Sequence, residues 1–381
     1  MEKEAFYNPI REHIFSVPGL IGDELGRIFE EAKNSAAFLR QKDIGQIILT
    51  GCGYSYAASL SVACGLRELT GRQVTALPAI EAARFLQLPM SEWERTLVIG
   101  ISNSGLVTRV NEAVATCRQQ GAAAIGLTSN TRGELIRYCD SCLDISSPEF
   151  GRPLPLRGYA MTIAALLAVG CALTGNAGQG ELVRGILAGS MEELEASLPE
   201  IDDMAWDYVQ LNPALEQFEF VGSGYERGAA FLGKIEMMGQ AGLMAVDEDT
   251  EQWLHCNFFM AAPERIGTIL FLAKNSPGYS RAVEALSYMK HLKRPACVVT
   301  DDRDILNDPD SRSVYLPALN AVNGGLLQMT VPSLLTGYYC RLKGEEYSRG
   351  FRGPWEIFKD GRGTTKSGSD LLDELGRREE K

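Results

Sequence analysis

Residues 96–105 read TLVIGISNSG, a buried-type apolar run that ends in two serines, an asparagine and a glycine. Such a run, followed directly by small polar residues, is typical of a strand that enters a strand-to-helix turn. Similar runs occupy 44–50 and 123–128, and a helix-length periodic segment follows each of them. This alternation predicts a parallel sheet covered by helices, with ligands bound beyond the carboxyl ends of the strands.

The same alternation occurs a second time along the chain. Apolar runs recur at 218–221, 266–273 and 296–299, followed by a mainly apolar stretch at about 325–342. Two glycine turns of similar form, GCGY at 51–54 and GSGY at 222–225, each follow the first strand of a cycle. Repetition of this kind indicates an internal duplication. Because 381 residues also suit two domains, we expect two doubly wound α/β domains in tandem.

The acidic, helix-patterned segment that ends at Pro213 predicts a connector between these domains. Beyond Lys343 the chain is rich in Gly, Arg and Lys without periodicity, so this tail is expected either to be disordered or to fold over a site. The expected segments are an N-terminal extension (1–30), a first domain (31–190), the connector (191–213), a second domain (214–343) and the tail (344–381).

Composition narrows the class of protein. Hydrophobic residues make up 45% of the chain and charged residues 23%, which is an ordinary globular balance. A formal net charge of -12 argues against broad binding to nucleic acid or to anionic membranes, since both depend on clustered Lys and Arg. Residues 1–18 lack the apolar core of a secretory signal, and the stretch 162–173 is too short to span a bilayer and predicts a buried helix.

Cysteine usage points to a reducing compartment. The chain has nine cysteines, an odd number scattered through apolar segments, which suits a cytoplasmic location. Cys139 and Cys142 form a CxxC without a second pair of matching spacing. We therefore expect no metal and no cofactor.

The loop after the strand at 96–101 is the first candidate for chemistry. Ser102, Asn103, Ser104 and Gly105 offer two hydroxyls and several amides just before a helix expected to start near Thr108. A phosphate needs short donors that converge without bulk at the positive end of a helix. The same residue types also cap helices in the absence of any ligand, and the loop alone leaves both interpretations open.

Four motifs, in order, resemble the sugar isomerase (SIS) domain proteins, in particular the isomerase half of glucosamine-6-phosphate synthase and the related phosphosugar deglycases and deaminases. They are GCGYSY at 51–56, ISNSG at 101–105, VGSG at 221–224 and the stretch 232–255. The resemblance extends over nearly the whole chain. It implies two SIS domains, a homodimer and a phosphorylated sugar as substrate.

The resemblance also implies which residues bind the phosphate. In the family a Ser-x-Ser-Gly-x-Thr loop holds the sugar phosphate, so Ser102, Asn103 and Ser104 are expected to take that role. Where the family has its closing Thr, this chain has Val107, with Thr108 one place later. We include Thr108 among the candidate phosphate ligands.

Other candidates concern the sugar itself. By resemblance Gly53 and Ser55 line the sugar, while their structural alternative is a tight turn and a helix cap. Where the synthase carries a Ser-Thr-Lys segment, this chain reads RPLPLRG at 152–158, which indicates a different substrate. Arg157 favours a substrate with an additional carboxylate, such as an amino acid conjugate. A solvated surface arginine is the alternative.

Proton transfer between the first two carbons of an open-chain sugar needs a base at the carbon and a group that opens the ring. By resemblance the base is Glu236, and His255, which the family often presents to the neighbouring subunit, opens the ring. Lys366 is similar to a lysine of the family that closes over the substrate. The alternative for Glu236 is a surface carboxylate on an amphipathic helix, and that for His255 is a structural histidine. The alternative for Lys366 is a disordered tail. His13 and His291 are expected to be structural or exposed.

Together these expectations describe an enzyme that acts on a sugar 6-phosphate through an enediol or enaminol. Aldose-ketose isomerisation, ammonia release from an amino sugar phosphate, and cleavage of a sugar phosphate from an amino acid amine all use this proton transfer, and the three remain open. The synthase's glutamine-hydrolysing domain has no counterpart here, so ammonia release from glutamine is not expected. The alternative is a phosphosugar sensor without catalysis, because SIS domains also occur in such regulators.

Overall fold

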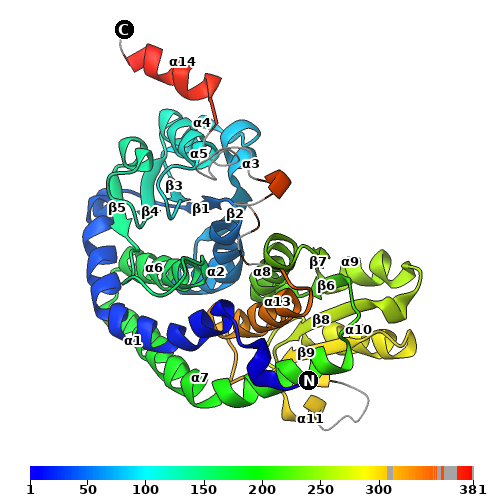
Figure 1. The fold of residues 1–381 in the computed structure, drawn as a ribbon. Coiled ribbons are helices and arrows are strands. Elements are labelled where there is room, and N and C mark those ends of the chain that lie inside the picture. The colour runs from blue at the N-terminus through cyan, green and yellow to red at the C-terminus, as the bar shows by residue number, and fades with distance from the viewer. Residues whose placement is uncertain (307–311, 346, 348, 350–352, 356–366, 380–381) are drawn as a thin grey trace. The chain divides into compact units, whose positions relative to one another are not determined.

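Figure 1 shows the computed structural model, which describes residues 1–306, 312–345, 347, 349, 353–355 and 367–379. Contacts within the chain divide it into two units. The N-terminal sheet unit consists of Asp23–Pro148, Gly158–Gly185 and Gly353–Lys381. The C-terminal sheet unit consists of Met1–Gly22, Glu149–Arg157 and Ile186–Arg352.

The N-terminal sheet unit contains a parallel sheet with strand order β2-β1-β3-β4-β5. Its strands are β1 (Gln46–Gly51), β2 (Gln73–Pro78), β3 (Thr96–Ile101), β4 (Ala123–Thr128) and β5 (Ser141–Asp144). The helices that lie wholly in this unit are η2 (Ala37–Gln41), α2 (Tyr54–Thr70), α3 (Ala79–Arg84), α4 (Met90–Trp93), α5 (Thr108–Gln119), η3 (Glu134–Tyr138), η9 (Gly353–Trp355) and α14 (Asp370–Glu379).

The C-terminal sheet unit contains a second parallel sheet, with order β10-β9-β8-β6-β7. Its strands are β6 (Gln217–Val221), β7 (Met244–Glu248), β8 (Ile266–Leu272), β9 (Ala296–Thr300) and β10 (Arg312–Tyr315). Its helices include η1 (Lys3–Phe6), η4 (Gly224–Glu226), α8 (Arg227–Glu236), η5 (Met237–Ala241), α9 (Thr250–His255), η6 (Asn257–Phe259), η7 (Pro263–Arg265), α10 (Tyr279–His291), α11 (Arg303–Leu306), α12 (Gly324–Gln328) and α13 (Thr330–Leu342). Strands β6 to β10 take the same places as β1 to β5, so the predicted α/β pattern is used twice.

Three of the five boundaries between the units fall inside helices, namely α1 (Pro9–Ser35), α6 (Leu156–Thr174) and α7 (Ala177–Leu211). The expected extension at 1–30 is thus largely helical, and the expected connector at 191–213 is the second half of the longer helix α7. Continuous helices thus cross between the units at three places where the sequence predicted other boundaries. The tail from residue 344 contains regular structure in η9 and α14.

Helix α6 includes the apolar stretch for which a buried helix was predicted. The helix begins upstream of that stretch and is 19 residues long. Among the described residues it is the one helix long and apolar enough to cross a membrane, and 83% of its most apolar window is buried inside the structure.

The central strands of the first sheet are fully buried. Every residue of β3 and of β4 is covered, as expected for strands with helices on both faces. Helix α5 lies very close to β3, since a Cβ added at Gly100 would be 2.2 Å from Cγ2 of Val114. This close approach holds the start of α5 directly beside the loop that follows β3.

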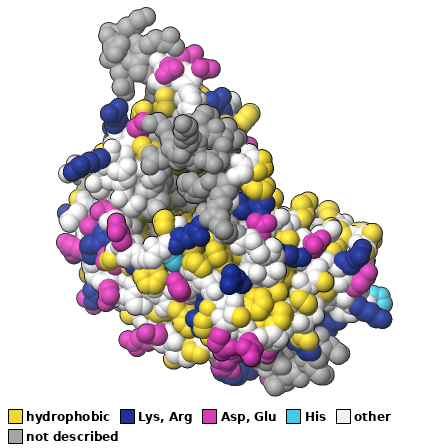
Figure 2. Space-filling view, viewed as in Figure 1, with side chains coloured by type: hydrophobic (Ala, Val, Ile, Leu, Met, Phe, Trp, Pro, Cys, Tyr) yellow, Lys and Arg dark blue, Asp and Glu magenta, His cyan; other side chains and the backbone are white. Residues whose placement is uncertain are grey.

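The surface carries both signs of charge. Figure 2 shows Lys and Arg side chains interspersed with Asp and Glu side chains over the face in view. The chain's formal net charge of -12 therefore coexists with local clusters of basic residues.

We predict that Gly100→Ala destabilises the fold by about 1–3 kcal/mol, because the added methyl group overlaps Val114 in a packed core. Gly185→Ala in α7 is the matched control, since nothing lies within 4 Å of its added Cβ. Denaturant unfolding followed by tryptophan fluorescence measures both. Equal stability of Gly100→Ala and the unsubstituted chain would contradict the close packing of α5 on β3.

Candidate functional site

The candidate site lies where the chain connections of the first sheet diverge. Strands β1 and β3 are parallel neighbours, but β1 connects to β2 on one side and β3 to β4 on the other. Gly51 lies opposite Ile101 in this pairing. The turn at Gly53 and the loop 102–105 therefore emerge side by side at the carboxyl edge. Ligands of doubly wound sheets bind at this kind of position.

Hydrogen bonds within the loop 102–105 fix its turn. The Ser102 amide donates to the carbonyl of Leu127 at 3.0 Å, and the Gly105 amide donates to the Ser102 carbonyl at 2.8 Å. The buried Ser102 hydroxyl accepts a weak 3.5 Å bond from the Val107 amide at the start of α5. Gly105 has a φ of +64°, and an added Cβ would lie 3.0 Å from the Cα of Gly133. Glycine is therefore required there whether or not a ligand binds.

The carbonyl groups of this loop are turned into the protein. The Asn103 carbonyl accepts bonds from the amide and the hydroxyl of Ser129 at 3.0 and 2.7 Å. The side chain of Asn130 donates to the Ser104 carbonyl at 2.9 Å. Among the described residues, the amides of Asn103 and Ser104 have no acceptor. Donors without acceptors beside the start of α5 form a suitable place for an anion.

The turn after β1 contributes space and a helix start. Gly53 has a φ of +54° and precedes α2, and nothing lies within 4 Å of the place its Cβ would occupy. Gly51 cannot carry a side chain, because an added Cβ would lie 2.6 Å from the Cβ of Ser55. Gly53 and Ser55 thus have structural roles in the turn and the start of α2.

The C-terminal segment returns to this part of the sheet. The Ser367 amide donates to Oγ1 of Thr108 at 3.2 Å, and Arg109 donates to the Gly368 carbonyl at 2.8 Å. Residues 367–369 therefore lie on the first turns of α5, so this portion of the tail is folded against the candidate site. Lys366 itself lies outside the described residues. The Thr108 hydroxyl, a candidate phosphate ligand, has an intramolecular partner in this arrangement.

A buried carboxylate holds this segment in place. Glu112 of α5 is fully buried and pairs with Arg109 at 2.6 Å and with Arg84 at 3.0 Å. The hydroxyl of Ser369, just before α14, also donates to Glu112. Burial of an ion pair is favourable only when its remaining polar atoms are satisfied, so the tail contributes to the stability of α5.

The predicted acid-base residues belong to the C-terminal sheet unit. Glu236 ends α8 with 1% exposure, and the hydroxyl of Ser333 in α13 donates to its Oε2 at 2.6 Å. The surface-carboxylate alternative for Glu236 is therefore wrong. His255 ends α9, its side chain is 68% exposed, and its Nε2 lies 3.0 Å from a carboxyl oxygen of Glu251. The Arg281 guanidinium beside Glu251 holds the pKa of that carboxyl below its usual range.

Arg157 and His13 also lie in the C-terminal sheet unit. Arg157 is 9% exposed, donates to the Ser16 hydroxyl at 3.0 Å and lies over the ring of Phe150. The solvated-surface alternative for Arg157 is therefore wrong. His13 is buried, and burial lowers its pKa, while one ring nitrogen lies 2.8 Å from the Arg152 carbonyl. His13 thus fits a structural role.

The CxxC pair lies beside β4. A Cβ added at Gly126 would be 2.8 Å from Sγ of Cys139 and 3.0 Å from Sγ of Cys142. The hydrogen bond that the Cys139 thiol donates to Cys142 raises the pKa of Cys139. In the part of the chain that the structure describes, no three His, Cys, Asp or Glu side chains are grouped to hold a metal ion.

The second sheet has the same divergence point, but a carboxylate occupies it. Glu226 is buried and accepts bonds from the Ala273 amide, just after β8, at 2.7 Å and from the Ser223 amide at 3.3 Å. Counted from the first glycine of each turn, Glu226 takes the place that Ser55 has in the first sheet. This carboxyl group already accepts the amide donors that a bound phosphate would need there. The glutamate at position 226, where the first turn has Ser55, was the available sequence signal.

Comparison with known proteins places this geometry in a family. Residues 38–173 match the model of the SIS domain, and this part of the chain is an SIS domain. Glutamine-fructose-6-phosphate aminotransferase (isomerizing) from Gloeobacter violaceus is 26% identical over 302 residues, covering 77% of this chain and 47% of that protein. The chain thus spans about half the length of this relative.

Solved structures share the fold over most of the chain. The C-terminal domain of glucosamine-fructose-6-phosphate aminotransferase from Francisella tularensis has a TM-score of 0.74 at 15% identity, covering 91% of this chain and 99% of that one. Tagatose-6-phosphate ketose/aldose isomerase from Escherichia coli has a TM-score of 0.68 at 18% identity, covering 85% and 91%. At these identities the likeness establishes the α/β fold with its two parallel sheets.

We predict that Glu226 makes stability depend on pH. Burial raises the pKa of Glu226 to about 8, outweighing its two amide donors. The folded state then keeps a proton that the unfolded chain loses above its ordinary pKa of about 4.5. Stability conferred by the neutral group is therefore complete at low pH and is lost as pH rises towards 8, by up to about 1.4 kcal/mol per pH unit.

The variant Glu226→Gln keeps the shape of the neutral carboxyl group without titrating. Denaturant unfolding of both proteins between pH 5 and pH 9 measures the difference in free energy of unfolding. We expect the variant to gain stability relative to the unsubstituted chain as pH rises, with a plateau above about pH 8. A difference independent of pH would contradict a raised pKa.

Proposed function

We propose that this chain binds a phosphorylated sugar at the loop 102–105 and processes it by proton transfer between neighbouring carbons. The observation that carries the proposal is the pair of Asn103 and Ser104 amides, which lack acceptors among the described residues and lie between the starts of α2 and α5. The relatives named above act on fructose 6-phosphate or tagatose 6-phosphate according to their names, which supports a sugar 6-phosphate as ligand.

In this proposal Ser102, Asn103 and Ser104 hold the phosphate with their hydroxyls and amides, while Gly53 and Ser55 leave room for the sugar carbons. Thr108 joins them when its contact with the tail is exchanged for the ligand. A dianionic phosphate accepts several charge-assisted hydrogen bonds, so a few amides and hydroxyls are sufficient to fix the ligand's position.

Glu236 is the proposed base. It removes a proton from the carbon next to the carbonyl of the open-chain sugar, and the electron pair left behind forms the enediol or enaminol. Return of the proton to the neighbouring carbon completes an isomerisation. Where the sugar carries an amine, the same protonation of the enaminol gives an imine, and addition of water to its carbon breaks the C–N bond and releases the amine, which is deamination or deglycation. The hydrogen bond from Ser333 orients the carboxyl group.

His255 and Lys366 are proposed to open the ring and to cover the substrate. The 68% exposure of the His255 side chain suits a residue that acts in a neighbouring subunit, so we further propose a homodimer in the cytoplasm. Arg157 already has Ser16 and Phe150 as partners, so a substrate carboxylate would have to replace the Ser16 contact. The amino acid conjugate therefore remains one of three substrate types to be compared by product analysis.

A phosphosugar sensor is the second candidate, and one observation favours it. The chain's three histidines all belong to the C-terminal sheet unit, whereas the predicted phosphate loop belongs to the other unit. The loop-bearing unit thus has the groups for binding but no imidazole of its own. A sensor would bind the sugar phosphate and leave it unchanged.

We predict that Ser104→Ala weakens binding of fructose 6-phosphate about 10- to 100-fold, the effect of losing a hydrogen bond to a charged group. Isothermal titration calorimetry measures the dissociation constant. Ser197→Ala, which removes an exposed hydroxyl on α7, is the matched control and leaves binding unchanged. Unaltered affinity in Ser104→Ala would remove this hydroxyl from the site.

We predict that Glu236→Gln reduces turnover of the sugar phosphate at least 100-fold while the dissociation constant changes little, because general-base catalysis typically contributes a factor of this size. Turnover is followed by product analysis of fructose 6-phosphate, glucosamine 6-phosphate and an amino acid conjugate of a sugar phosphate. Glu264→Gln, an exposed carboxylate of the same unit, is the control. Binding without any product in the unsubstituted chain would identify the sensor.

A further inference from the structure

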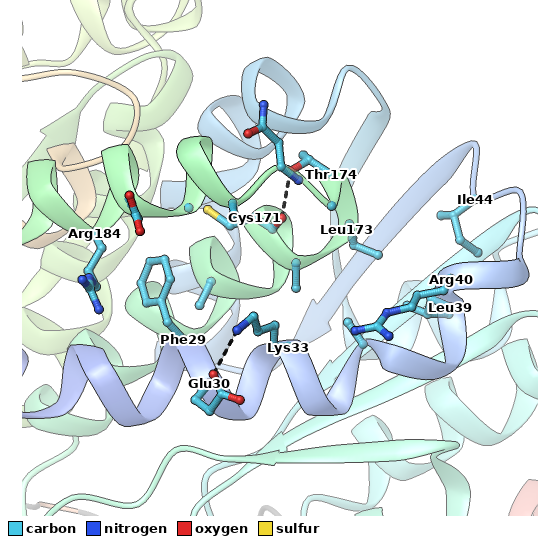
Figure 3. Close-up of a pocket in the computed structure, with 18 of the residues that line it drawn as sticks. Phe29, Glu30, Lys33, Leu39, Arg40, Ile44, Cys171, Leu173, Thr174 and Arg184 are labelled. Atoms are coloured by element: carbon cyan, nitrogen blue, oxygen red, sulfur yellow. Dashed lines mark hydrogen bonds and ion pairs between the residues drawn. The ribbon is translucent and has the colours of Figure 1, made fainter.

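A cavity lies wholly within the N-terminal sheet unit, away from the predicted phosphate loop. Its volume is about 690 Å³, and it is lined by α1, η2, the end of α6 and the start of α7 (Figure 3). Ile44 and Arg72, which also line it, come just before β1 and β2. The cavity therefore opens at the amino ends of the strands, whereas the loop 102–105 lies at their carboxyl ends.

The lining is basic in an otherwise acidic chain. It includes the five cations Lys33, Arg40, Lys42, Arg72 and Arg184 and only two acids, Glu30 and Glu181. Five positive charges against two negative charges contrast with the formal net charge of -12 for the whole chain. Clustered cations in a concave site raise the local concentration of anions.

Most of these cations lack partners. Lys33 pairs with Glu30 at 3.1 Å, and Nε of Arg72 donates to the Ile44 carbonyl at 2.7 Å. The side chains of Arg40, Lys42 and Arg184 make no hydrogen bond or ion pair with any residue that the structure describes. Arg40 and Lys42 are close neighbours in the chain, in η2 and directly after it, whereas Arg184 comes from α7, and Figure 3 shows Arg40 and Arg184 at opposite ends of the cavity.

Apolar side chains form the remaining wall. Leu39, Ile44 and Cys171 are almost completely buried, and Phe29 and Leu173 are half-buried. Figure 3 shows Phe29 and Lys33 pointing from α1 towards the helices across the cavity. An inorganic anion would bind to the cations but would leave the apolar wall exposed to water. An uncharged apolar ligand would cover the wall but would remove water from the cations without supplying a partner for their charge.

We propose that this cavity binds a small organic polyanion in which phosphate groups adjoin an aromatic or apolar part, the chemistry of a nucleoside di- or triphosphate. Arg40 and Lys42 bind the phosphate groups at one end of the cavity, and Phe29 with Arg184, which Figure 3 shows together at the other end, contacts the aromatic part. The volume of about 690 Å³ falls inside the range typical of small-molecule sites. The site is separate from the one that binds the sugar phosphate.

The test uses isothermal titration calorimetry of the full chain with ATP and UTP as probes, and with pyrophosphate and adenosine as partial probes. We expect at least one nucleotide to bind ten-fold or more tightly than either partial probe, with an affinity that falls as salt rises. Arg40→Ala and Arg184→Ala are each expected to weaken binding about 10-fold or more. Arg118→Ala, an exposed arginine of the same unit outside the cavity, leaves it unchanged.

The proposal is wrong if neither nucleotide binds, if pyrophosphate binds as tightly as the nucleotides, or if the nucleotide affinity is unchanged in Arg40→Ala and Arg184→Ala. Binding that is lost in Ser104→Ala and competes with fructose 6-phosphate would assign the anion to the loop 102–105 and also overturn it. Circular dichroism of each variant confirms folding, which is expected because both arginines are exposed. The sugar-phosphate proposal is measured with different variants, so either proposal can fail alone.

Discussion

The parallel pairing of β1 with β3 is the constraint on which the candidate site depends. Because Gly51 lies opposite Ile101, the residues after each strand emerge together at one edge of the sheet. The bonds from Ser129 and Asn130 then hold the loop's carbonyl groups inward, and the amides of Asn103 and Ser104 face the remaining space. The same pairing separates this edge from the basic cavity at the amino ends of the strands.

The two sheets share a strand order but carry a different residue at one place in the turn after their first strand. Both have a glycine turn after the first strand and the same strand order. In the first sheet the turn is followed by Ser55, a small neutral residue, whereas in the second the carboxyl group of Glu226 bonds the amides that an anion would need. The carboxyl group of Glu226 thus accepts in one unit the kind of amide hydrogen bond that we propose for a phosphate in the other.

The sequence was most informative where the structure is most buried. The central strands were predicted because β3 and β4 are apolar throughout, but the edge strands β2, β5, β7 and β10 were missed, since short, partly exposed strands lack that signal. The loop 102–105 was found because its residues are consecutive. The bonds of Ser369 to Glu112 and of Glu226 to Ala273 join distant segments, which one sequence read alone does not pair.

The return of the C-terminal segment to α5 has a consequence for the order of assembly. The strands of the first sheet are complete by Asp144, yet Ser367 and Ser369 supply bonds to Thr108 and Glu112 in that same unit. The ribosome synthesises a chain from its N-terminus, so N-terminal segments are available to fold first. Ser369, one of the partners of the buried Glu112, is synthesised more than two hundred residues after it. The N-terminal sheet unit therefore gains its last contacts only after the chain of the C-terminal sheet unit has been made.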